Sequence, residues 1–123
     1  MEFEGNTVII MDVLNKEKIE RLASEIGADN VPILLDIFLG ELAQYKSKLT
    51  DDSSLDVVSY LKEISHALKS SAASFGAEVL CAYAIELDSM AKAGQSFDPN
   101  SSRDKMIDLL SETESHYQRL VSQ

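Results

Sequence analysis

The apolar residues of this chain recur three and four positions apart, and few residues interrupt them. The 123 residues include only two prolines and five glycines, so long segments contain no residue that would break a helix. A spacing of three and four keeps side chains on one face of an α-helix, whereas a half-buried strand would need strict alternation. The sequence therefore predicts an all-α fold.

Five helices are expected from this pattern. Asn15 is suited to cap the first helix, Gly27, Gly76 and Gly94 provide stops, and Pro32 is tolerated in a first turn. The expected helices run from about Asn15 to Ile26, from Val31 to Leu49, from the residues after Ser54 to Phe75, from Glu78 to Ala93, and from a cap at Ser101 or Ser102 through Leu120. The four longer helices predict an antiparallel up-down four-helix bundle, with the short first helix capping one end.

The length of the chain predicts one domain over residues 1–123, because this is enough for one core and too short for two. The segment 94–102 is rich in Gly, Ser, Pro and Asn, which predicts a loop before the last helix. Residues 1–11 are expected to form a flexible extension. Four amphipathic helices can close a bundle without a second chain, so a monomer is expected.

Charge and motifs exclude several classes of function. Eleven basic against 21 acidic residues give a net charge of −10, which disfavours binding to nucleic acid or to anionic membranes. The single cysteine, Cys81, cannot form an internal disulfide, and Met1 to Gly5 lack the basic start of a secretory signal. A cytoplasmic location is therefore expected. No nucleotide-binding loop or metal-ligand spacing is present, so we expect no cofactor and no independent catalytic activity.

The two histidines lie in different settings. His116 is near the end of the last expected helix, where a cation complements the helix dipole, and a solvated or capping role suffices for it. His66 lies in the middle of the third expected helix. With Leu61 taken as zero, the apolar positions of that helix centre near 345°, whereas His66 falls at roughly 140° at 100° per residue. The sequence therefore predicts that His66 points away from the core.

The neighbours of His66 on this outer face are two cations and two small residues, Lys62, Lys69, Ser70 and Ala73. A neutral imidazole nitrogen is a good nucleophile near pH 7. Phosphoryl acceptance also needs positive charge for the phosphoryl oxygens and space for the donor. The pattern predicts phosphoryl acceptance at His66, with Ser70 and Ala73 forming a low surface for docking, although an ordinary surface histidine is also compatible with it.

The stretch from His66 through Leu68, Lys69 and Ser70, followed by Gly76, resembles the histidine-containing phosphotransfer (Hpt) domain family. That family is all-helical, and its pattern is His-x-Leu-Lys-Gly with a second Gly ten positions after the His. Ser70 stands where the family usually has Gly.

The resemblance implies that His66 is phosphorylated, through Nε2, and that Lys69 lies near the phosphoryl oxygens, with Gly76 as a structural turn. A phosphoryl-stabilising role for Lys62 rests on helix geometry alone. The implied partners are the receiver domain of a hybrid sensor histidine kinase and that of a response regulator. Their reactive aspartates exchange the phosphoryl group with the histidine, and the receivers supply the magnesium.

Two other classes of function remain open from the residues. An acidic helical bundle could bind a basic or helical partner without ever carrying phosphate. An enzyme could use His66 as a general base, but it would need a pocket and an orienting acid that an outer helix face does not supply. Acid-labile, base-stable labelling by a phosphorylated receiver would separate the phosphorelay from both alternatives.

Overall fold

The computed structural model describes residues 13–52 and 54–121, and within this part every regular element is helical. The elements are α1 (Lys16–Ile26), a 3₁₀ turn η1 (Ala28–Asn30), α2 (Val31–Asp51), α3 (Val57–Phe75), α4 (Glu78–Lys92) and α5 (Pro99–Val121). The predicted all-α fold is confirmed. None of the described helices combines the length and apolar content of a membrane-spanning segment. The predicted extension over residues 1–11 lies outside the described residues.

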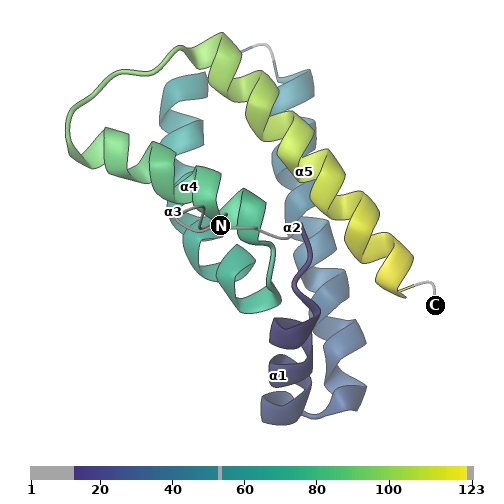
Figure 1. Cartoon of the computed structure of the whole chain (residues 1–123). Helices are drawn as coiled ribbons and strands as arrows, with labels where there is room; N and C mark the ends of the chain where they lie inside the picture. Colours follow the sequence, from purple (N-terminus) through teal and green to yellow (C-terminus); the bar gives the residue numbers. More distant parts are fainter. Residues whose placement is uncertain (1–12, 53, 122–123) are drawn as a thin grey trace, which may run out of the picture.

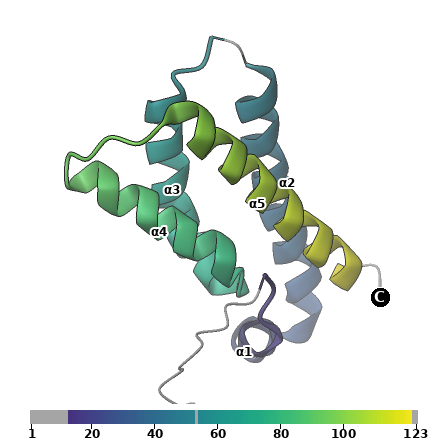
Figure 2. The ribbon, with the colours of Figure 1, turned by 45° about the horizontal axis from the view of Figure 1, so that its top comes forward.

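The helices form a bundle around one core. Helix α3 packs most extensively against α4, and α2 against α5. Figures 1 and 2 show α5 running beside α2, and α4 crossing α3 obliquely in both views. The strict up-down order of the four long helices stays a prediction. The large apolar side chains that are completely buried in the core are Phe38, Leu42, Leu61, Ile64, Leu68, Leu80, Leu87, Met106, Leu110 and Tyr117.

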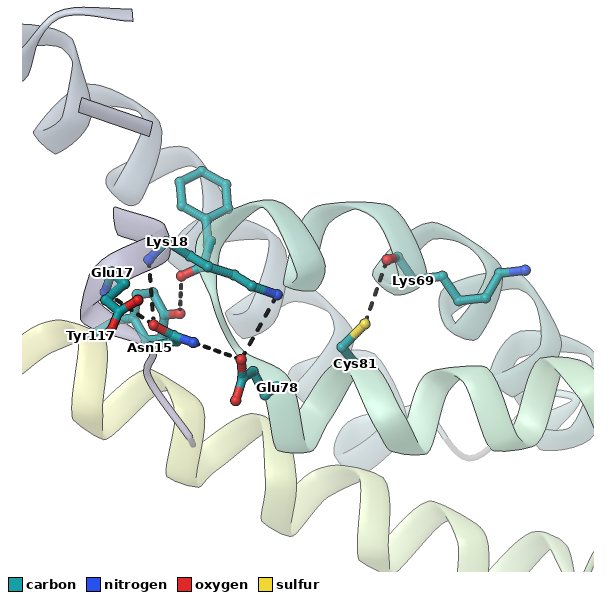
Figure 3. A network of polar contacts seen from close by, with 8 residues as sticks. Asn15, Glu17, Lys18, Lys69, Glu78, Cys81 and Tyr117 are labelled. Carbon is teal, nitrogen blue, oxygen red and sulfur yellow. Dashed lines mark hydrogen bonds and ion pairs between the residues drawn. The ribbon is translucent and has the colours of Figure 1, made fainter. Parts of the chain in front are cut away.

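The short helix α1 covers the end of the bundle where α2 begins and α3 ends (Figures 1 and 2). Its N-cap is Asn15, whose side chain accepts hydrogen bonds from the backbone N–H groups of Glu17 and Lys18. The amide of Asn15 donates to Glu78 at 2.7 Å, and Lys18 forms an ion pair with the same carboxylate at 3.8 Å. Figure 3 shows this network, which attaches α1 to the start of α4.

The turn between α3 and α4 is held from the other side by α5. Tyr117 donates from its hydroxyl to the backbone carbonyl of Phe75 at 2.5 Å (Figure 3), and burial raises the pKa of Tyr117 well above its usual value. Gly76 follows in the left-handed conformation, with φ of 79°, and ends α3. This turn lies between α1 and α5, so the C-terminal half of α3 is fixed against three other helices.

Two helix starts differ from the sequence prediction. Helix α3 begins after Asp56, whose carboxylate accepts from the backbone N–H of Ser59, and not directly after Ser54. Helix α5 begins at Pro99, so the predicted loop over 94–102 was too long and the predicted cap at Ser101 or Ser102 was wrong. The carboxylate of Asp98 accepts from the N–H of Asn100 at 3.3 Å, and proline has the φ of a first helical position.

Candidate functional site

His66 lies on the outer face of α3, near the middle of the helix. Its side chain is 73% exposed, while the residue before it, Ser65, and Leu68 two residues later are completely buried. The predicted outward orientation is therefore confirmed. Because the ring contributes little to the core, it is available to a partner without any change in the packing of α3.

Asp88 of α4 is a neighbour of His66 that sequence reasoning missed. Its Oδ1 lies 3.8 Å from Nδ1 of His66, although the residue is only 7% exposed. This distance is longer than a hydrogen bond and within the range of an ion pair. The signal that could have found Asp88 is an acid next to Leu87 on the buried stripe of α4, since a carboxylate there needs a cationic partner.

Two lysines are the cationic partners of Asp88. Nζ of Lys69 donates to Oδ2 of Asp88 at 2.6 Å, and Nζ of Lys92 lies 2.9 Å from the same oxygen. These hydrogen bonds lower the pKa of Asp88 to about 2, and the contact with Asp88 raises the pKa of Lys92. The carboxylate therefore stays ionised at neutral pH. It joins the two lysines and His66 into one charged cluster, here called the Asp88 cluster.

Lys69, which the sequence placed near His66, thus reaches the histidine through Asp88. Its side chain is 29% exposed, and its backbone carbonyl accepts from the thiol of Cys81 at 3.6 Å (Figure 3). Cys81 is half-buried, and burial raises the pKa of its thiol. The backbone of α3 at Lys69 is therefore held against α4, while its ammonium group lies beside Asp88.

The other predicted site residues lie on both sides of His66. Lys62 is exposed, one turn before the histidine, and lines a shallow hollow of about 240 Å³ with residues of α4 and of the loop before α5. Ser70 is exposed, one turn after the histidine. Ala73 is half-buried and lines a groove of about 390 Å³ against Lys18 and Leu22 of α1. Ser70 therefore lies on an open surface, and Ala73 lies where that surface meets α1.

Helix α2 exposes two large apolar side chains in its first two turns. Ile33 and Ile37, one turn apart, are 58% and 63% exposed. One turn after Ile37, the carboxylate of Glu41 accepts a long hydrogen bond of 3.5 Å from the hydroxyl of Ser71 on α3. This contact joins α2 to α3 at Ser71, and Ile33 and Ile37 precede it along α2.

The second histidine has a local role. Nδ1 of His116 donates to the backbone carbonyl of Glu112, one turn earlier in α5, at 2.9 Å. The bond lies within α5 and the residue is half-buried, so the solvated or capping role stays a prediction. Asp52, in the turn after α2, accepts from both the N–H and the hydroxyl of Ser54, and these bonds lower its pKa.

Comparisons with known proteins agree with the family resemblance found in the sequence. The model of the Hpt domain family matches residues 33–120. A curated relative, "Phosphorelay protein LuxU" of Vibrio cholerae serotype O1, is 57% identical over 108 residues, which cover 88% of this chain and 96% of the relative. The protein of the same name from Vibrio harveyi is 55% identical over 106 residues, covering 86% and 93%.

A solved structure supports the fold. The crystal structure of histidine-containing phosphotransfer protein B (HptB) from Pseudomonas aeruginosa PAO1 superposes with a TM-score of 0.74, covering 89% of this chain and 95% of that one, at 19% identity. The two proteins therefore share the helical bundle, although only 19% of the residues are identical.

Proposed function

The chain belongs to the Hpt domain family, and from this we propose that it is a phosphorelay intermediate of a quorum-sensing two-component pathway. The observation that carries the proposal is the exposed imidazole of His66, whose Nδ1 faces a buried carboxylate within a chain 53–57% identical to proteins named for phosphorelay. His66 accepts the phosphoryl group from one receiver aspartate and gives it to another.

The transfer uses the nitrogen on the other side of the ring from the carboxylate. The lone pair of Nε2 attacks phosphorus in line, the N–P bond forms, and the P–O bond to the receiver aspartate breaks, so that its electron pair leaves with the carboxylate. The proton on Nδ1 stays in place, and the imidazole ring becomes cationic. Asp88, 3.8 Å from Nδ1 of His66, stabilises that charge. The second transfer is the reverse of these steps on another receiver.

The cations beside His66 act on the phosphoryl oxygens. The ammonium group of Lys69 is held next to the histidine by Asp88, so a short rotation of its side chain brings it to the incoming group. Lys62, exposed one turn before the histidine, adds positive potential from solvent and acts more weakly. Charge-assisted contacts to phosphoryl oxygens are about twice as strong as neutral hydrogen bonds.

The receiver docks over Ser70 and the adjacent outer face of α2. Ser70 is small and exposed, which lets the backbone of a partner approach His66. Ile33 and Ile37 add exposed apolar area on the first two turns of α2, and apolar area at the centre of an interface supplies much of its affinity. Ala73 and its groove against α1 form the edge of the surface.

The partner receiver domains supply the phosphoryl group, its acceptor and the magnesium ion. The receiver domain of a hybrid sensor histidine kinase delivers the phosphoryl group, and the receiver domain of a response regulator takes it. The magnesium required by the acyl phosphate chemistry is bound by the receiver. A cytoplasmic, monomeric carrier without its own ATP site fits this role.

The experiment that tests this function is labelling by a phosphorylated receiver. The parent chain should acquire label that is labile to acid and stable to base, as expected of phosphohistidine, whereas His66→Gln should acquire none. Because His66 is exposed, the substitution should change the free energy of unfolding by no more than about 0.5 kcal/mol. Incubation with ATP and magnesium but no kinase should leave the parent unlabelled.

Two results would contradict the proposal. Label retained in His66→Gln would assign the phosphoryl group to another residue, such as Ser71. A parent chain that binds the receiver tightly but is never labelled would support the acidic interaction module instead. His116→Gln is the matched control, and it should be labelled like the parent.

A further inference from the structure

Asp88 accepts two lysines on one oxygen atom. Lys69 of α3 and Lys92 of α4 both contact Oδ2, at 2.6 Å and 2.9 Å, while Oδ1 is the oxygen that faces Nδ1 of His66. The two lysines differ in setting, since the side chain of Lys69 is 29% exposed and that of Lys92 is 65% exposed. One ammonium group would suffice to neutralise the carboxylate, so the second one requires an explanation.

The phosphorelay function, on which this inference rests, places two demands on Lys69. In the structure its ammonium group donates a hydrogen bond to Asp88. During transfer the same group must turn toward the phosphoryl oxygens. Each movement toward the phosphoryl group weakens the contact with Asp88. A side chain that is only 9% exposed would then lose the nearest countercharge of its carboxylate, and an uncompensated buried charge is strongly unfavourable.

We propose that Lys92 is a positioning residue that holds Asp88 when Lys69 turns to the phosphoryl group. With Lys92 in place, Oδ2 keeps a cationic partner throughout the transfer. Oδ1 then remains directed at Nδ1 of His66 while the ring acquires its positive charge. Lys92 thereby lowers the free energy needed to move the ammonium group of Lys69 away from Asp88.

The placement of Lys92 suits this role. It lies four residues after Asp88 on the same helix, so its contact does not depend on the side chains of α3. An acid followed by a lysine at this spacing is the favourable orientation for a helical ion pair. Lys92 is also the last residue of α4, where a cation interacts favourably with the helix dipole. The Asp88 contact raises its pKa, so it remains charged.

The test compares phosphorylation rates of Lys92 variants with phosphoramidate, a small donor that needs no protein docking. Lys92→Gln should be phosphorylated roughly threefold to tenfold more slowly than the parent, the size of a coupling between neighbouring charges. Lys92→Arg should keep most of the parent rate because it retains the charge. Lys16→Gln, which removes an exposed lysine of α1, is the matched control and should leave the rate unchanged.

A double-mutant cycle shows whether Lys92 acts through Asp88. In the Asp88→Asn background no carboxylate remains to be held, so adding Lys92→Gln should change the rate by less than about twofold. An equal slowing by Lys92→Gln in both backgrounds would mean that Lys92 supplies only general positive potential, which overturns the proposal. A Lys92→Gln chain as fast as the parent overturns it as well.

These outcomes are separate from a failure of the function itself. If the parent forms no phosphohistidine with either phosphoramidate or a receiver, the phosphorelay proposal fails. If the parent is labelled on His66 and only the Lys92 coupling is missing, the positioning role alone fails. Circular dichroism and the melting temperature of each variant establish that it is folded.

Discussion

Asn15 and Gly76 lie in direct backbone contact, although they come from opposite ends of the described α1–α3 region. The N–H of Asn15 donates to the carbonyl of Gly76 at 2.8 Å. A Cβ atom added to Gly76 would lie 2.7 Å from the carbonyl oxygen of Asn15, and φ at this glycine is +79°. Both the turn after α3 and the docking of α1 therefore require a residue without a side chain.

Gly76→Ala should destabilise the chain. The left-handed backbone costs an alanine about 1 to 2 kcal/mol, and the contact with Asn15 adds to this, so we expect a loss of roughly 2 to 3 kcal/mol and a melting temperature lower by roughly 8 to 15 °C. The matched control is Gly40→Ala, inside α2, where an added Cβ meets nothing within 4 Å. It should stabilise the chain by about 0.5 to 1 kcal/mol. Equal melting temperatures for the two variants would contradict this account.

Lys69→Ala should slow phosphorylation of His66 by roughly tenfold to a hundredfold, since a charge-assisted contact is worth about 1.5 to 3 kcal/mol. Lys62→Ala should slow it by less than about threefold, because an exposed cation acts through solvent. Initial rates with phosphoramidate at low ionic strength measure both. A larger effect at Lys62 than at Lys69 would reverse the assignment of the two lysines.

Ser70→Trp should reduce exchange with a receiver by at least about tenfold, equivalent to roughly 1.4 kcal/mol of lost transition-state stabilisation. The indole would fill the exposed surface one turn after His66 that a partner has to approach. Phosphoramidate, which needs no docking, should label Ser70→Trp at about the parent rate. Parent-like exchange with the receiver would place the docking surface elsewhere.

Ser70→Gly tests the same surface by making the side chain smaller instead of larger. Glycine is the usual residue of the family at this position, so exchange with the receiver should be as fast as in the parent or faster. The helix should lose about 0.5 to 1 kcal/mol of stability, which a thermal melt would detect. Slower exchange in Ser70→Gly, with the helix intact, would show that the serine hydroxyl itself takes part in docking.

The pairing of Asp88 should make stability depend on pH in the acid range. The folded pKa of Asp88 is lowered from 3.8 to about 2 by its lysine contacts, so its contribution is complete above pH 3.8 and is lost as the pH falls through 2. Asp88→Asn should therefore be less stable than the parent at neutral pH, with a difference that shrinks on acidification. Urea unfolding of both chains across this range measures it. A difference independent of pH would contradict the ionised pairing.

The sequence determined the helices and the direction of His66, because both follow from rules that act within one helix. Apolar spacing located five helices, and the angle of His66 from the stripe of Leu61 and Leu68 predicted its exposure. The start of α5 could also have been predicted locally, since Asp98 and Pro99 form an ordinary helix start. The Gly, Ser and Asn residues around them are typical of a loop, and for this reason the predicted start was too late.

Only the tertiary structure decided which groups surround His66. Asp88 lies 19 residues from Lys69 along the chain, and their contact depends on how α4 crosses α3. The packing of side chains between the two helices sets that crossing, and no periodicity within either helix contains it. The approach of Asn15 to Gly76 is of the same kind. The outward direction of His66 could therefore be predicted from the sequence, whereas the carboxylate of Asp88 comes close to it only when the two helices pack.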